Sequence, residues 1–208
     1  LASDINLIKN ILKSNGFYFA EVVPSLIENN DLNSVKLKIE IDQGERARIK
    51  DIIFIGDKKI KDKKLLEVIA SEEHKFWKFI SKKVYLNESL INLDKRLLRN
   101  YYLNQGYYNV EIVNSFAELN DKQSFKLVFN INAGKKYYFN NLSLNLPPDY
   151  DKKDFAKIDK IFKKLKNKRY SLDRINLILE EIDKIASLRL YDFIDANVSE
   201  EIIEDDKI

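Results

Sequence analysis

The chain has 208 residues, 45% of them hydrophobic and 33% charged, as is typical of a globular protein. It contains no cysteine, which excludes disulfide bonds and thiolate metal sites, and no apolar run of about 18 residues, which excludes a membrane-spanning helix. The net charge of +3 is too small to indicate one class of partner.

The first elements expected in chain order are a helix and two strands. Apolar residues recur at helical spacing over Asp4–Asn15, and Gly16 ends that helix because glycine adopts a left-handed conformation at low cost. The strand expected over Phe17–Glu28 contains Pro24, which removes a ladder donor and therefore favours a sheet edge. Strict alternation over Val35–Asp42 predicts a second strand with one buried face. The apolar residues of that face are Val35, Leu37, Ile39 and Ile41.

The middle of the chain predicts five elements. In chain order they are a strand at Arg48–Ile55, helices at Asp62–Ala70 and Glu88–Asn104, and strands at Tyr107–Glu118 and Ser124–Asn132. Ser71–Tyr85, between the helices, is expected to be irregular. We expect Asn87 to cap the long helix and Gly106 to end it. The core face of the last strand comprises Phe125, Leu127, Phe129 and Ile131.

The last part of the chain predicts most of a further unit. Its elements are a strand at Tyr138–Leu146, a helix at Lys153–Leu165, a helix capped by Ser171 and running to about Ser187, and a strand at Tyr191–Val198. We expect the final strand of this unit to begin where the chain stops, at Ile208. Because the chain also opens on Leu1 inside a helical pattern, we expect it to be a fragment of a longer protein.

A repeat at a separation of 90 residues organises these elements. Asp4–Gly44 aligned on Asp94–Gly134 without a gap gives 16 identities in 41 positions. The repeat predicts a tandem array, and such arrays usually present binding surfaces rather than a catalytic cleft. The predicted fold class is α+β, with tandem β-α-α-β-β domains, each a three-stranded mixed sheet covered by two helices. The expected domains are a partial one at 1–43 (second helix and last two strands), a complete one at 44–133, and one lacking its last strand at 134–208.

This unit resembles a POTRA domain, the polypeptide-transport-associated repeat that precedes the outer-membrane barrel of BamA-type assembly factors. The resemblance is carried by the turns Asn15-Gly16-Phe17 and Gln105-Gly106-Tyr107, the helix Arg96–Tyr102, and the passage from Gly44 to Gly56. The segment Lys75–Tyr85 is also similar to the Trp-bearing loop of the third BamA repeat. The resemblance implies part of repeat 2, all of repeat 3 and most of repeat 4. The third unit departs from it, because Leu146 and Leu190 stand where glycines would recur.

The edge strand is the main candidate binding site. If the first strand of a β-α-α-β-β sheet lies parallel beside the last, the middle strand is left at an edge with unpaired backbone groups. The candidate residues are Tyr108, Asn109, Val110, Glu111, Ile112 and Val113. An extended segment of another protein can pair with such an edge by β-augmentation. The alternative is a blunted edge that binds nothing.

Two other surface features carry alternatives of their own. Phe76, Trp77 and Phe79 form an aromatic cluster, which is either a docking loop for a partner protein or a small core folded onto its own domain. Two basic stretches either face anionic lipid head groups or are solvated helix faces, and no nucleic-acid motif accompanies them. The stretches are Lys58, Lys59, Lys61, Lys63 and Lys64, and then Lys160, Lys163, Lys164, Lys166, Lys168 and Arg169.

Enzymatic chemistry is not expected. His74 is the only histidine, and the sequence has no cysteine and no Gly-rich phosphate loop, so nucleophile triads, His-based metal sites and P-loops lack their parts. We therefore predict no catalytic residue, metal or cofactor.

The resemblance implies a function at the periplasmic face of the bacterial outer membrane. The chain would be a scaffold and chaperone-like module that binds unfolded outer-membrane β-barrel proteins, docks accessory assembly lipoproteins and continues into a membrane β-barrel. The alternatives are the substrate-recognition arm of a two-partner-secretion or translocation-type transporter, and a passive structural spacer.

Overall fold

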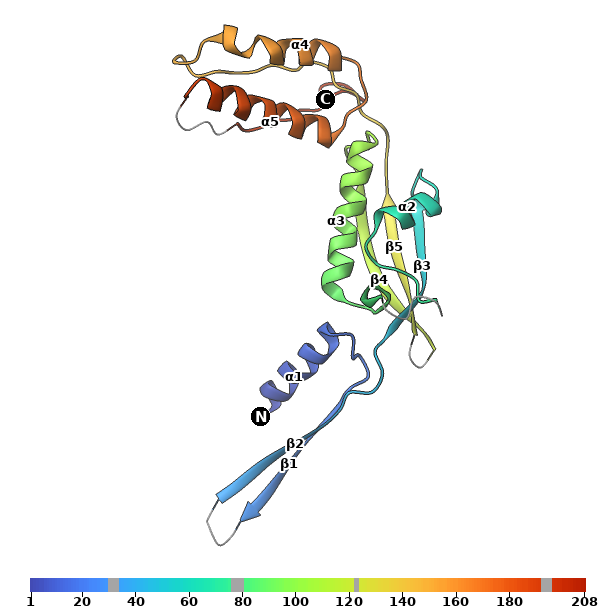
Figure 1. Ribbon diagram of the computed structural model, residues 1–208. Coiled ribbons are helices and arrows are strands. Elements are labelled where there is room, and N and C mark those ends of the chain that lie inside the picture. Colours follow the sequence, from blue (N-terminus) through green and yellow to red (C-terminus); the bar gives the residue numbers. More distant parts are fainter. Residues whose placement is uncertain (30–33, 76–80, 122–123, 192–195) are drawn as a thin grey trace. The chain divides into compact units, whose positions relative to one another are not determined.

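Figure 1 shows the computed structural model of the chain, which describes residues 1–29, 34–75, 81–121, 124–191 and 196–208. The chain divides into two compact units, one of Leu1–Leu98 with Ile112–Ile131 and the other of Arg99–Glu111 with Asn132–Ile208. The domain boundaries expected after residues 43 and 133 stay a prediction. No helix in the described part is long and apolar enough to span a bilayer.

The elements follow the predicted order through Asn132. They are α1 (Ala2–Ser14), β1 (Glu21–Asn29), β2 (Ser34–Asp42), β3 (Arg48–Asp57), α2 (Asp62–Val68), the 3-10 helix η2 (Lys82–Val84), α3 (Glu88–Asn104), β4 (Glu111–Asp121) and β5 (Ser124–Asn132). After them come the 3-10 helix η3 (Lys152–Phe155), α4 (Ala156–Leu165) and α5 (Leu172–Leu188).

The first unit begins with a hairpin of β1 and β2, against which α1 packs. The strands are antiparallel with Pro24 opposite Ile39, and the sheet has only two strands, so the predicted edge position of Pro24 is confirmed. The prediction of one buried face is wrong for most of β2, because Val35, Leu37 and Ile41 are exposed. The reason is coverage: α1 packs near Val22 and Ile39, and no other described element covers the rest of that face.

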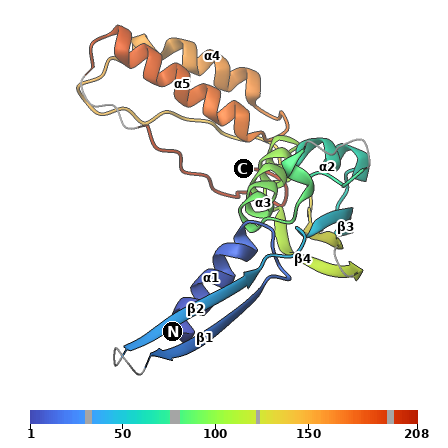
Figure 2. The same ribbon diagram turned by 60° about the horizontal axis from the view of Figure 1, so that its bottom comes forward.

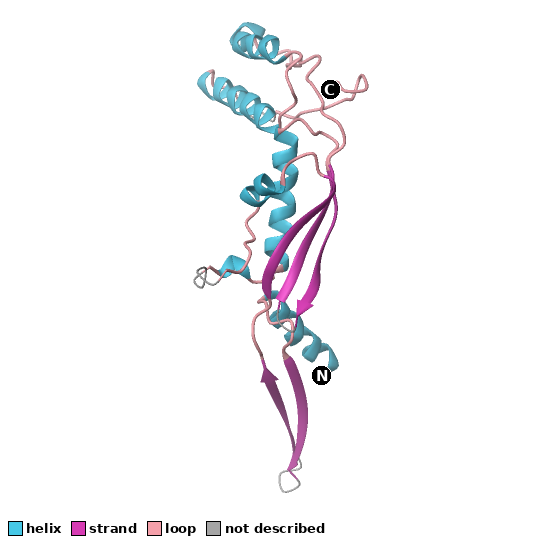
Figure 3. Cartoon of the chain, turned by 90° about the vertical axis from the view of Figure 1, so that its right-hand side faces the viewer, coloured by secondary structure: helices cyan, strands magenta, loops and turns pink. Residues whose placement is uncertain are grey.

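A three-stranded sheet with the order β3-β5-β4 follows, which confirms the strand order predicted from the sequence. Figures 1 and 3 show α2 and α3 on one face of this sheet. The Phe54 and Phe129 rings stack at 5.7 Å in its core. The predicted cap of α3 is also confirmed, since Asn87 Oδ1 accepts from the Leu90 amide at 3.0 Å.

A buried carboxylate joins α3 to the end of α2. Asp94 Oδ1 accepts hydrogen bonds from the amides of Ala70 (2.6 Å) and Ser71 (3.1 Å). Burial raises the pKa of the Asp94 carboxyl, although hydrogen bonds from Ser71 and Ala70 lower it in part. Asp94 therefore holds the chain that leaves α2 against the long helix.

The second unit contains the predicted helix pair α4 and α5, which lie side by side (Figure 2). Their core comprises Phe155, Ile158, Ile178, Ile182 and Ile185. Ser171 occupies the predicted N-cap position of α5, but no backbone amide donates to its side chain. Asn104 Oδ1 takes that role by accepting from the Asp173 amide at 2.8 Å.

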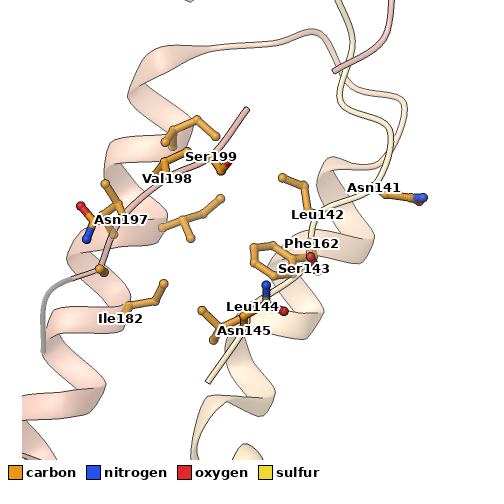
Figure 4. Close-up of a pocket in the computed structure, with 14 residues that line it drawn as sticks. Asn141, Leu142, Ser143, Leu144, Asn145, Phe162, Ile182, Asn197, Val198 and Ser199 are labelled. Atoms are coloured by element: carbon orange, nitrogen blue, oxygen red, sulfur yellow. The ribbon is translucent and has the colours of Figure 1, made fainter. Parts of the chain in front are cut away.

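The strands predicted at Tyr138–Leu146 and Tyr191–Val198 are wrong for the described residues, where only isolated bridges form. One of them pairs Tyr138 in parallel with Lys207. Asn141–Asn145 and Ala196–Ser199 instead line opposite sides of a cavity of about 340 Å³ (Figure 4). Leu142 and Phe162 point into it. A strand needs a hydrogen-bonding partner along its length, and among the described residues Asp206–Ile208 pair only with the start of the first segment, at Tyr138–Asn140.

Candidate functional site

The two edges of the three-stranded sheet differ in what covers them. The β3 edge is partly covered by its own chain. The His74 amide donates to the Ile49 carbonyl at 2.7 Å, and the Ile52 amide donates to Glu73 Oε1 at 3.3 Å. These bonds use the backbone groups that an added strand would need, so the first half of β3 is closed to pairing.

The β4 edge is open by comparison. β5 lies on one side of β4, and no described strand pairs with the other side. Three apolar side chains along it are exposed, namely Val113 (56%), Phe116 (46%) and Leu119 (54%). A row of unpaired backbone groups beside apolar side chains is the arrangement that takes up an extended segment of another protein.

The strand β4 begins three residues later than the first of the predicted binding residues. Tyr108, Asn109 and Val110 precede β4, and only Glu111, Ile112 and Val113 lie on the strand. The reason is that the first three serve the local packing. The side-chain amide of Asn109 donates to the Tyr137 hydroxyl at 2.7 Å, and Val110 is buried.

The edge also extends further than predicted. The predicted site omits Phe116 and Leu119, although both lie on β4 and are exposed. The alternation of apolar and polar residues is irregular in this strand, so spacing alone does not mark its exposed face. The available signal is the position of Phe116 in a strand expected at an edge.

An open cavity of about 690 Å³ lies at the start of β4 and is lined by aromatic and charged groups. Burial, and then Glu200, raise the pKa of Tyr170, so its hydroxyl stays protonated and donates to Glu200 Oε1 at 2.9 Å. The Tyr108 ring packs on Tyr170 with centroids 5.0 Å apart. Arg99 and Glu111 also line this cavity, so its wall carries side chains of both charges.

The predicted docking loop of Phe76, Trp77 and Phe79 lies outside the described residues. Within the described ranges, no group of three or more His, Cys, Asp or Glu side chains is placed to hold a metal ion. The groups along the β4 edge are backbone amides and carbonyls, apolar side chains and a few charged side chains.

The model of the POTRA family, described as "Surface antigen variable number repeat", matches residues 1–44 and 47–134. The chain belongs to the POTRA family. This POTRA chain is 30% identical over 159 residues to the outer membrane protein assembly factor BamA of Buchnera aphidicola, covering 74% of this chain and 25% of that protein. For BamA of Neisseria meningitidis serogroup B the identity is 26% over 153 residues, covering 72% and 19%.

A solved structure shows the same fold. The crystal structure of Haemophilus influenzae BamA POTRA3-5 superposes with a TM-score of 0.58 at 13% identity, covering 99% of this chain and 76% of that one. The resemblance to POTRA repeats of a BamA-type factor and the α+β fold class are thereby confirmed. The chain spans only a quarter of the Buchnera protein and about a fifth of the Neisseria protein.

Proposed function

We propose that this chain is a periplasmic scaffold and chaperone-like module of an outer-membrane β-barrel assembly machine. In this proposal β4 takes up an extended segment of an unfolded barrel protein as an additional strand. The observation that carries it is the contrast between the two sheet edges, because β3 is partly closed by its own chain and β4 is open. The similarity to BamA supports the cellular setting.

The expected complex is weak, as transient handling of a client requires. About four to six main-chain hydrogen bonds form along β4, each contributing a net ~1 kcal/mol. The ordering of the client segment offsets much of this. The exposed side chains of Val113, Phe116 and Leu119 add apolar contacts to the client. No cofactor or catalytic step is needed.

The machine proposed here includes accessory assembly lipoproteins and a membrane barrel in the longer protein. The segment with Phe76, Trp77 and Phe79 is the candidate docking loop for those lipoproteins, with a small core folded onto its own domain as the alternative. This part of the proposal derives from the similarity to BamA and not from the described geometry.

Site-specific photo-crosslinking tests the β4 edge. A photo-reactive residue is placed at Val113, Phe116 or Leu119, and the chain is mixed with a peptide of about ten residues that alternates apolar and polar like a barrel strand. The matched controls are Leu177 and Leu188 on α5, which are at least as exposed. We expect strong crosslinks from β4 and weak ones from α5. Equal labelling at both places would leave the chain a spacer and overturn the proposal.

Proline substitution supplies a second test. Asn114→Pro and Ser115→Pro each remove one amide, and successive amides of a strand point to opposite edges. One variant therefore breaks a bond to β5 and unfolds earlier in denaturant, whereas the other loses only an outward donor. The variant with the parental unfolding midpoint should show several-fold weaker peptide crosslinking. Undiminished crosslinking in that folded variant would contradict augmentation at β4.

A further inference from the structure

Charge is strongly segregated in this chain. Residues 152–169 contain nine cationic and two acidic residues, whereas the rest of the chain contains 27 cationic and 31 acidic residues. All nine cationic side chains are exposed. A basic segment within an otherwise slightly acidic chain is typical of a surface that meets an anionic partner.

The helix α4 arranges part of this charge along one side. Lys157, Lys160 and Lys164 recur at a spacing that places them in line along the helix. The apolar side of the same helix packs through Ile158 and Phe162 into the core with α5. Because that side is already occupied, the fold fixes the lysine side outward and leaves α4 no apolar face to insert elsewhere.

The two basic stretches differ in how far they are neutralised. In the first, Lys58 pairs with Asp62, and Lys59 and Lys64 pair with Asp57 and Glu67 at 2.8 Å. In the second, Lys157 pairs with Glu181 at 2.6 Å. Among the described residues, no ion pair is formed by Lys152, Lys153, Lys160, Lys163, Lys164, Lys166 or Lys168.

We propose that this second stretch, the α4 lysine surface (Lys152 to Arg169), binds the head groups of an anionic phospholipid bilayer. Eight of its nine cations are lysines, which act as mobile point charges and suit a plane of lipid phosphates better than one bidentate ligand. The helix has no exposed aromatic residue that would anchor a protein interface. No stacking platform or nucleic-acid motif accompanies the lysines.

The binding mode follows from the packing. With its apolar side buried, α4 attaches by electrostatic attraction alone and does not insert into the acyl region. The attachment is reversible and weakens as salt screens the charges. This inference goes beyond the proposed function and does not depend on it, since peptide pairing at β4 and lipid binding at α4 involve different residues and separate measurements.

Vesicle co-sedimentation of the 208-residue chain tests the proposal. Vesicles of phosphatidylcholine with about 30% phosphatidylglycerol are compared with pure phosphatidylcholine vesicles at about 0.15 M salt and at higher salt. We expect binding to the anionic vesicles only, with loss at high salt. The test variant removes four charges by the substitutions Lys153→Gln, Lys160→Gln, Lys163→Gln and Lys164→Gln. We expect it to bind the anionic vesicles at least tenfold more weakly than the parent.

The matched control removes the same number of exposed charges from other places. It is Lys9→Gln, Lys50→Gln, Lys61→Gln and Lys63→Gln. We expect it to keep most of the binding, with both variants showing the parental circular dichroism spectrum. Equal losses in the two variants would mean that net charge alone acts, and would overturn the α4 assignment. Undiminished binding of the α4 variant, equal binding to uncharged vesicles, or tighter binding to a single-stranded oligonucleotide would overturn it as well.

Discussion

Two clusters of backbone hydrogen bonds, here called joints, lie at equivalent places of the repeat and have the same pattern. The first joint is built on Gly16 and Ala47, and the second on Gly106 and Tyr137. In the first joint, the Gly16 carbonyl accepts from the Ala47 amide at 2.8 Å, and the Ala47 carbonyl accepts from the Leu86 amide at 2.9 Å. In the second joint, the Gly106 carbonyl accepts from Tyr137 at 2.8 Å, and Tyr137 accepts from Tyr170 at 2.9 Å. Gly16 and Gly106 lie 90 residues apart, as do Ala47 and Tyr137, so the repeat extends to these backbone hydrogen bonds.

The side chains that complete the two joints differ. In the first joint, the Arg46 guanidinium lies over the rings of Phe17 at 5.0 Å and Tyr85 at 5.4 Å. In the second, Lys136 lies over the single ring of Tyr107 at 5.4 Å. The two joints therefore share their backbone hydrogen bonds but differ in the cation and the aromatic rings that pack around them.

Each joint also contains an asparagine, and the two side chains play opposite hydrogen-bonding roles, one as donor and one as acceptor. In the first joint, Asn87 belongs to the following helix and its side-chain amide donates to the Ser14 carbonyl at 2.7 Å. In the second, Asn104 belongs to the preceding helix and accepts from the Asp173 amide. One asparagine donates across its joint and the other accepts, which gives substitutions that act differently at the two places.

The largest expected effect comes from the glycines. Gly16 and Gly106 have φ angles of +91° and +90°, so alanine costs about 1–2 kcal/mol of unfolding free energy at each. At Gly106 the new methyl group would also meet Arg169, with the side-chain Cδ at 2.8 Å. In denaturant unfolding we expect Gly106→Ala to be more destabilising than Gly16→Ala. Adding Arg169→Ala to Gly106→Ala should remove only the cost of the contact with Arg169. If adding Arg169→Ala to Gly106→Ala leaves the unfolding free energy unchanged, the Arg169 side chain moves aside without cost.

Substituting the asparagines by aspartate sharpens the comparison. Asn104→Asp keeps the acceptor for Asp173. Its negative charge is favourable at the N-terminus of α5 and unfavourable at the C-terminus of α3, so stability should stay about level. Asn87→Asp keeps the helix cap but loses the donor to Ser14 and should cost about 1 kcal/mol. Denaturant unfolding measures both, and alanine at either position, which should cost about 1 kcal/mol, is the control. Equal effects of the two aspartates would contradict the opposite roles.

A smaller difference is expected at the stacked cations. Arg46→Ala should cost about 1 kcal/mol, because one guanidinium contacts two rings, and Lys136→Ala about 0.5 kcal/mol. Hydrogen exchange at the Ala47 and Tyr137 amides reports each joint separately. Faster exchange should appear at Ala47 in the first variant and at Tyr137 in the second. The conservative Arg46→Lys change should lie between the parent and Arg46→Ala, since lysine keeps the charge and loses the planar stack.

The helices and the order of the three-stranded sheet could be predicted because their signals are local. Helical spacing, the Asn87 cap and the glycine stops act within a few residues, and Gly106 indeed has a positive φ. The start of β4 is predicted too early, because the aromatic Tyr107 and Tyr108 favour a strand by propensity. In the structure their rings pack in the second joint instead.

Features that depend on a distant partner could not be predicted. Alternation in β2 indicates one apolar face but not what covers it, and Leu37 is exposed because α1 packs elsewhere on the hairpin. The segment Tyr138–Leu146 has strand-like composition, yet pairing requires a neighbouring strand along its length. The closing of the β3 edge by His74 likewise involves an irregular segment, for which no periodic pattern exists.

The smallest expected difference concerns Asp4 and Asp94, which occupy the same position of the repeat. Asp4 is exposed, whereas Asp94 is buried. Burial raises the folded-state pKa of Asp94 above its usual 3.8, so the unfolded chain releases this proton at lower pH than the folded chain does. The contribution of Asp94 to stability is therefore fully present below pH 3.8 and declines as the pH rises through the raised pKa.

The substitution Asp94→Asn should abolish this decline, because an asparagine side chain cannot titrate but keeps an oxygen for the Ala70 and Ser71 amides. Denaturant unfolding of the parent and of Asp94→Asn between about pH 3.5 and 7 measures it as a difference that grows with pH in favour of the variant. Asp4→Asn is the matched control, because it removes an exposed carboxyl at the same position of the repeat. A difference that is constant with pH for Asp94→Asn would mean that the carboxyl titrates alike in the folded and unfolded chains, and that its burial has no electrostatic cost.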